Sequence, residues 1–139
     1  MDAIPPIRLS IDVKADPATV WTYLTDPERV AEWFTDATPL GAVGDRYQLD
    51  FGEGSVVEGI VLGHDPGRRF AHSWAWADAE PRQETAVEWT IEALPDGGTR
   101  ITLEHGGWLE AGSDDAARDD HEAYWSGYLD DLAALLSEA

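Results

Sequence analysis

Residues 7–34, IRLSIDVKADPATVWTYLTDPERVAEWF, decide the fold of this chain. Residues 7–13 are apolar at every second position, which predicts a half-buried β-strand. Two Asp-Pro pairs follow, Asp16-Pro17 and Asp26-Pro27. Asp accepts hydrogen bonds from the free amides of a first helical turn, and Pro suits the first helical position. The pairs predict two short helices ending near Leu24 and Phe34, each too short to be stable without tertiary packing.

Downstream of the helix pair and a predicted loop over residues 36–44, the pattern is that of a β-meander. Five stretches alternate apolar and polar residues, or run between turn signals such as Gly52-Glu53-Gly54 and Pro95-Asp96-Gly97-Gly98. The predicted strands cover residues 46–51, 56–62, 70–76, 87–92 and 99–105. With the first strand, this makes six.

The C-terminal segment has helical periodicity instead. Ser113 is predicted to cap a helix whose first turn holds Asp114 and Asp115, which suits the helix dipole. An aromatic and aliphatic stripe then follows at helical spacing. Its members are His121, Tyr124, Trp125, Tyr128, Leu129, Leu132, Leu135 and Leu136. A sheet with one apolar face and one long amphipathic helix must cover each other. The fold class is therefore α+β: a single domain over residues 1–139, with a curved six-stranded antiparallel sheet wrapped on the last helix.

The amino-acid composition limits the kinds of partner that this protein can bind. The 139 residues include 28 acidic and 9 basic side chains, a net charge of −19 that argues against nucleic acid and anionic membranes. No apolar run approaches the roughly 20 residues of a membrane span, and no signal peptide is visible. We therefore expect a cytoplasmic protein, as a monomer or homodimer.

Motifs for cofactor chemistry are missing from the sequence. It has no cysteine, so thiolate nucleophiles and thiolate metal sites are excluded. It has no nucleophile elbow, phosphate loop or dinucleotide fingerprint. A three-histidine metal site is not demanded by any spacing. We expect no cofactor and no metal.

Four segments together resemble the START-type helix-grip superfamily, in the branch named after the heat-shock-protein ATPase activators. They read DPATVWTYLTDPERVAEWF (16–34), DPGRRFAHSWAW (65–76), GGTRITLEHGGW (97–108) and YWSGYLDDLAALL (124–136). The resemblance implies a cavity between the sheet and the last helix. It also leaves the function open, because similar proteins include polyketide cyclases and aromatases, lipid and hormone carriers, chaperone-binding modules and antibiotic self-resistance proteins.

Aromatic side chains are the candidate ligand-binding residues. Strand alternation and helical spacing turn many of them toward one space, and each Trp N–H or Tyr O–H needs a polar partner there, which suits a ligand cavity. A well-filled aromatic core is the alternative. The predicted ligand-binding set is Trp33, Phe34, Phe51, Trp74, Trp76, Trp89, Trp108, His121, Tyr124, Trp125 and Tyr128. The ligand we expect is a hydrophobic, aromatic or polycyclic small molecule that is carried or sequestered.

His72 and His105 are the candidate catalytic residues, should the protein be an enzyme. Both are predicted to point inward, on strands separated by one strand. A pocket histidine could move protons, as a cyclase-like activity requires. The alternative is that each is a buried neutral histidine bonded to a nearby hydroxyl. Glu88 and Glu104 fall on the outward face, which speaks against paired-carboxylate catalysis.

Overall fold

The computed structural model describes residues 4–39, 41–79, 83–108 and 111–137. Its elements follow the chain in the order β1 (Ile7–Val13), α1 (Pro17–Thr25), α2 (Pro27–Val30), β2 (Asp36–Ala37), β3 (Arg46–Asp50), β4 (Val56–Asp65), β5 (Arg69–Trp76), β6 (Thr85–Ala93), β7 (Thr99–Gly106) and α3 (Asp115–Ser137). The order of strand, helix pair, meander and final helix is the one predicted from the sequence.

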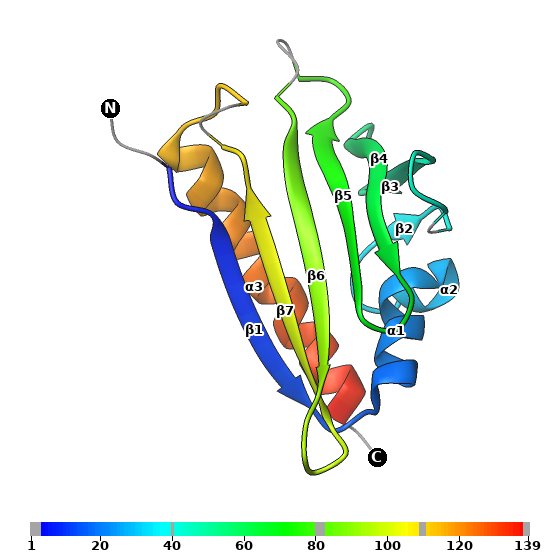
Figure 1. Ribbon diagram of the computed structural model, residues 1–139. Helices are drawn as coiled ribbons and strands as arrows, with labels where there is room; N and C mark the ends of the chain where they lie inside the picture. The colour runs from blue at the N-terminus through cyan, green and yellow to red at the C-terminus, as the bar shows by residue number, and fades with distance from the viewer. Residues whose placement is uncertain (1–3, 40, 80–82, 109–110, 138–139) are drawn as a thin grey trace.

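The strands form one antiparallel sheet in the order β1-β7-β6-β5-β4-β3-β2. Strands β3 to β7 are the meander, and β1 closes it by pairing with β7, with Ile7 opposite His105. The sheet curls, α3 packs along β1, and α1 and α2 lie at the other side of the curl (Figure 1). The space enclosed between the sheet, α3 and the helix pair is where the core and the cavities lie.

The prediction of six strands is wrong by one, because the segment after the helix pair is not wholly a loop. Asp36 and Ala37 pair with Asp50 and Leu49 of β3 and form the edge strand β2. A two-residue strand is too short to show an alternating pattern, so the sequence carries no signal for it.

The two Asp-Pro helix starts are confirmed. The Asp16 carboxylate accepts from the amide of Thr19 at 2.9 Å, and the Asp26 carboxylate accepts from the amide of Glu28 at 3.1 Å. The second helix is shorter than predicted, because α2 ends at Val30. Trp33 and Phe34 follow it in a turn that redirects the chain into β2.

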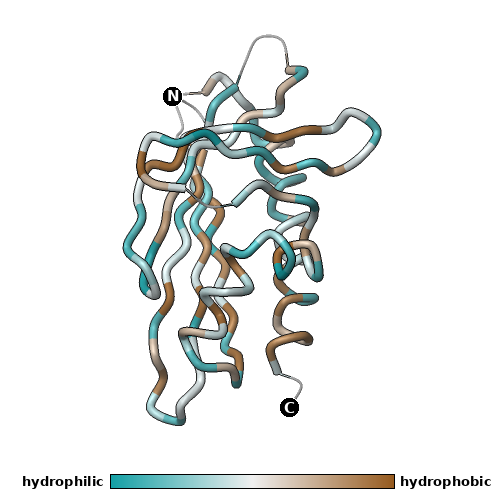
Figure 2. Tube along the Cα trace, turned by 90° about the vertical axis from the view of Figure 1, so that its right-hand side faces the viewer, coloured by the Kyte–Doolittle hydropathy of each residue, from teal (hydrophilic) through white to brown (hydrophobic). Residues whose placement is uncertain are grey.

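The long helix α3 begins one residue later than its predicted cap implies. The Asp114 carboxylate, and not the Ser113 hydroxyl, accepts from the free amide of Ala117 at 2.9 Å. The amide of Ser113 donates to the Trp108 carbonyl at 2.9 Å, which keeps Ser113 in the preceding loop. The hydrophobic residues of α3 gather toward its C-terminal end, as Figure 2 shows. Among the described residues, no helix has the length and apolar character needed to cross a membrane.

Candidate functional site

The larger cavity between sheet and α3 has a volume of about 300 Å³. Its walls come from β5, from the middle of α3, from the turn after β3 and from the loop after α2. The lining residues are Phe34, Phe51, Gly52, Glu53, Ser55, Trp74, Trp76, His121, Tyr124, Trp125 and Tyr128. Tyr124 is 60% exposed, and Glu53 and Ser55 are also exposed, so these residues form the mouth.

Eight of the eleven predicted ligand-binding residues line this larger cavity. Alternation along β5 brings Trp74 and Trp76 to it, and helical spacing on α3 brings His121, Tyr124, Trp125 and Tyr128. Phe34 and Phe51 complete the eight. The grouping is thus present in the structure, and their role in binding stays a proposal.

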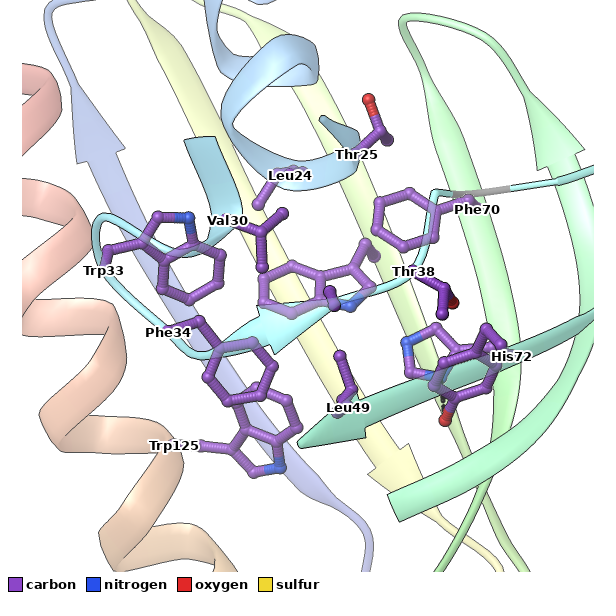
Figure 3. A pocket seen from close by; sticks show the side chains of 13 residues that line it. Leu24, Thr25, Val30, Trp33, Phe34, Thr38, Leu49, Phe70, His72 and Trp125 are labelled. Atoms are coloured by element: carbon purple, nitrogen blue, oxygen red, sulfur yellow. Dashed lines mark hydrogen bonds between the residues drawn. The ribbon is translucent and has the colours of Figure 1, made fainter. Parts of the chain in front are cut away.

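A smaller chamber of about 60 Å³ lies under the helix pair. Two more predicted ligand-binding residues, Trp33 and Trp89, line it together with His72. Leu24, Val30 and Leu49 give it partly aliphatic walls. Figure 3 shows this chamber, with His72 at the end away from α3.

Phe34 and Trp125 line both spaces and therefore stand between them. Their ring centroids are 5.2 Å apart, and Figure 3 shows the two rings side by side. Phe34 also packs edge-on against Tyr128, at 4.8 Å between centroids. The two rings are the partition between the larger cavity and the smaller chamber.

Trp108 and His105 line neither space. Trp108 packs on the far side of His105, with centroids 4.3 Å apart, and its indole N–H donates to the His105 carbonyl at 2.9 Å. Trp108 is only 2% exposed. It supports the cavity wall from behind.

His105 is held at both ring nitrogens. The Trp125 indole N–H donates to Nδ1 at 3.0 Å, so the ring proton resides on Nε2 and is donated to the Thr85 hydroxyl at 2.7 Å. Burial lowers the pKa of His105 to about 2, with further lowering from the nearby His121 and His72. The ring is neutral and both nitrogens are occupied, so His105 ties α3 to the sheet.

His121 is neutral for the same reason. Its Nδ1–H donates to the Ala117 carbonyl at 2.7 Å, which leaves Nε2 to accept the indole N–H of Trp76 at 3.1 Å. Burial lowers the pKa of His121, opposed by the hydrogen bond to Ala117 and by the charge of Asp120. The histidine fixes the Trp76 ring in the cavity wall.

His72 faces the smaller chamber and contacts Tyr47. Its Nδ1 lies 2.9 Å from the Tyr47 hydroxyl and 3.1 Å from the Ser73 carbonyl, and the Tyr47 hydroxyl donates to that same carbonyl. Burial lowers the pKa of His72 to about 4, opposed by the hydrogen bond to the Ser73 backbone. At neutral pH this imidazole is uncharged.

Gly59 allows Tyr47 to reach β5. Gly59 on β4 stands opposite Tyr47 on β3, and a Cβ at Gly59 would lie 2.5 Å from the Ser73 carbonyl oxygen and 2.7 Å from the Tyr47 ring. Only glycine therefore leaves room for the Tyr47 ring to cross β4. The sequence reading missed Tyr47, because its pattern marks it only as a strand residue.

Glu88 and Glu104 lie outward as expected, in ion pairs with Arg69 and Arg8. Across the described part of the chain, no three His, Asp or Glu side chains gather closely enough to hold a metal ion. Within that part, one buried side-chain polar atom lacks a hydrogen-bond partner, Nε1 of Trp74.

Comparison with known proteins gives a family-level match. Residues 14–137 match the family model described as Activator of Hsp90 ATPase homolog 1-like protein. No curated protein sequence matches the chain.

Solved structures share the fold over nearly the whole chain. DynU16, a protein of the dynemicin biosynthetic locus, is 27% identical with a TM-score of 0.82, over 94% of this chain and 46% of DynU16. The chain thus spans less than half of DynU16. CalU16 from Micromonospora echinospora is 25% identical with a TM-score of 0.78, over 95% of this chain and 76% of CalU16. The Aha1 dimer from Colwellia psychrerythraea, at 22% identity and a TM-score of 0.78 over 95% and 96% of the two chains, shows the fold alone.

Proposed function

Because the chain belongs to the Activator of Hsp90 ATPase homolog 1-like family, we propose that it binds a hydrophobic small molecule, aromatic or polycyclic, between the sheet and α3. The protein carries or sequesters this molecule. The observation that carries the proposal is the cavity of about 300 Å³. This volume lies at the lower end of the range of small-molecule sites, roughly 300–1,000 Å³.

The chemistry of the cavity wall supports an aromatic ligand. Seven of the eleven lining residues are Phe, Tyr or Trp. Their rings meet at many angles, for example Phe51 with Trp76 at 5.5 Å and 45°, and Trp74 with Trp76 at 6.1 Å and 88°. Such a wall offers both faces and edges of rings to a flat ligand. A module that only binds other proteins would not need a cavity here.

A catalytic role is a second candidate, favoured by the position of His72. This neutral imidazole lines the smaller chamber beside the Tyr47 hydroxyl, so a ligand that extended into the chamber would meet an uncharged base. His105 supports such a role less well, because both of its nitrogens are occupied and it lines neither space. Turnover that is lost in His72→Gln while binding persists would establish the catalytic role.

Titration with N-phenyl-naphthylamine, an uncharged aromatic dye that brightens in apolar surroundings, tests ligand binding. We expect one dye molecule per chain and quenching of Trp emission. Tyr124 and Tyr128 both lie in the cavity wall on α3. Replacing the two together by alanine should weaken dye binding by about tenfold. The result would contradict the proposal if the dye failed to bind, or bound the double variant as tightly.

A matched control is available on α1. Tyr23 is half-buried like Tyr128 but lines neither cavity. Tyr23→Ala should leave dye affinity unchanged. A loss in Tyr23→Ala equal to that in the double variant would mean that the dye reports general loosening and not the cavity.

A further inference from the structure

No aliphatic side chain is found among the described residues that line the larger cavity. Its described lining holds seven aromatic residues, and the other four are Gly52, Glu53, Ser55 and His121. The smaller chamber differs, since Leu24, Val30 and Leu49 contribute to it. Aromatic faces carry negative potential and attract cations, which aliphatic groups do not. A wall whose large apolar side chains are all aromatic can therefore attract a cation as well as bury apolar surface.

Among the described lining residues, a single side chain is negatively charged. Glu53 lies at the mouth, in the tight turn Gly52-Glu53-Gly54-Ser55. Its φ of +55° is the one left-handed backbone angle at a non-glycine residue in the described chain. Glycine or asparagine would take that conformation at lower cost. The residue that carries the carboxylate thus adopts, at the edge of the cavity, a backbone conformation that non-glycine residues rarely take.

No positive group opposes an incoming cation among the described lining residues. None of them is Lys or Arg. His121, the one lining residue that could become positive, already has both ring nitrogens in hydrogen bonds as a neutral tautomer. The net charge of −19 adds an attractive field for cations around the whole molecule.

From this wall and this carboxylate we infer that the ligand is a cation: an aromatic molecule bearing a quaternary or protonated amine. The flat part packs among the rings of β5 and α3, and the positive nitrogen lies near Glu53 at the mouth. The inference rests on the proposed function and specifies its ligand class. It assigns Glu53 a role as the charge-selecting residue of the cavity.

Two probes of equal shape and different charge test this assignment. Naphthylmethyl-trimethylammonium is a cation, and neopentylnaphthalene has the same skeleton with carbon in place of the nitrogen. Each is titrated against protein loaded with N-phenyl-naphthylamine, and the displaced dye is measured. We expect the cation to displace the dye at a concentration at least about tenfold lower than the neutral isostere does.

Glu53→Gln and Glu92→Gln form the variant pair. Both remove one negative charge, but Glu92 lies with Arg100 and Asp12 on the opposite, solvent face of the sheet. Glu53→Gln should weaken the cation by about fivefold and leave the neutral isostere unchanged, with the effect shrinking as salt is added. Glu92→Gln should change neither.

The outcomes separate this inference from the proposed function. If the two probes displace the dye equally well, the cation assignment is overturned while the cavity remains a binding site. If Glu92→Gln weakens the cation as much as Glu53→Gln does, the preference comes from the overall charge, and the role of Glu53 is overturned. If the dye itself does not bind, both proposals fail.

Discussion

The indole N–H of Trp125 on α3 donates to Nδ1 of His105 on β7 across 3.0 Å. The Nε2–H of His105 in turn donates to the Thr85 hydroxyl on β6. Both rings are almost completely buried. One hydrogen-bonded line therefore runs from the helix into the sheet through the middle of the aromatic cluster.

Trp125 should be the most sensitive position on α3. Trp125→Ala removes a large buried ring and should lower the free energy of unfolding by about 3–5 kcal/mol. Trp125→Phe keeps a ring but strips His105 of its donor, and should cost about 1–3 kcal/mol. Urea denaturation measures both. Trp21→Phe is the control, because Trp21 is only half-buried. A loss below about 1 kcal/mol in Trp125→Ala would show that α3 is not anchored there.

Acid should destabilise the protein through His72. Its folded pKa of about 4 lies below the ordinary 6.5, so the unfolded chain binds more protons between these values. The free energy of unfolding is therefore unaffected by His72 protonation above pH 6.5. It falls as the pH drops from 6.5 toward 4, by about 3 kcal/mol in total. Between pH 7 and pH 4.5, the free energy of unfolding should drop less in His72→Gln than in the unaltered protein.

The control for this pH dependence is His64→Gln, because the His64 side chain is exposed. The drop in stability between the two pH values should be the same in His64→Gln as in the unaltered protein. An unchanged drop in His72→Gln would mean that other groups, such as His105, govern the acid sensitivity.

Two glycine substitutions should act in opposite directions. Gly59→Ala would place its methyl group 2.5 Å from the Ser73 carbonyl oxygen and should lower the free energy of unfolding by about 1–3 kcal/mol. Gly127→Ala on α3 meets no atom within 4 Å and should raise it by about 1 kcal/mol, since Ala favours a helix. Thermal unfolding ranks the two variants. A stable Gly59→Ala would mean that Tyr47 does not need to cross β4.

Phe34→Ala should change the size of ligand that fits. Phe34 separates the larger cavity from the smaller chamber, so its truncation joins the two spaces. Pyrene, with four fused rings, should gain affinity relative to naphthalene. Phe51→Ala enlarges only the larger cavity and is the control. Equal gains in both variants would show that the partition does not limit ligand size.

Much of this arrangement follows from local patterns in the sequence. Alternation in residues 7–13 and in β5 fixes which side chains face α3, and the periodicity of α3 fixes which face meets the sheet. Those two patterns alone predict that Trp74 and Trp125 face the same space. The sequence predicts the cap of α3 one residue too early, because Ser113 and Asp114 are both good caps and only the contact of Ser113 with Trp108 in the loop distinguishes them.

The details of the site depend on contacts between distant segments. Tyr47 reaches His72 because Gly59 lies between them in space, and no spacing in the sequence shows that. In the sequence, Glu53 looks like an ordinary turn residue. Its position at the cavity mouth follows only from the packing of that turn near α3. The tautomers of His105 and His121 likewise follow from which indole each ring meets.

The pairing of β1 with β7 also governs how the chain can fold. Ser10 on β1 bonds to Thr102 on β7, residues 92 positions apart. Contacts of such long sequence separation slow folding, because a large loop must close before they form. During synthesis, β1 must wait without a strand partner until nearly the whole domain has left the ribosome. The last event in building the sheet therefore joins its first strand to its final one, and the cavity can be enclosed only once synthesis of the domain is almost complete.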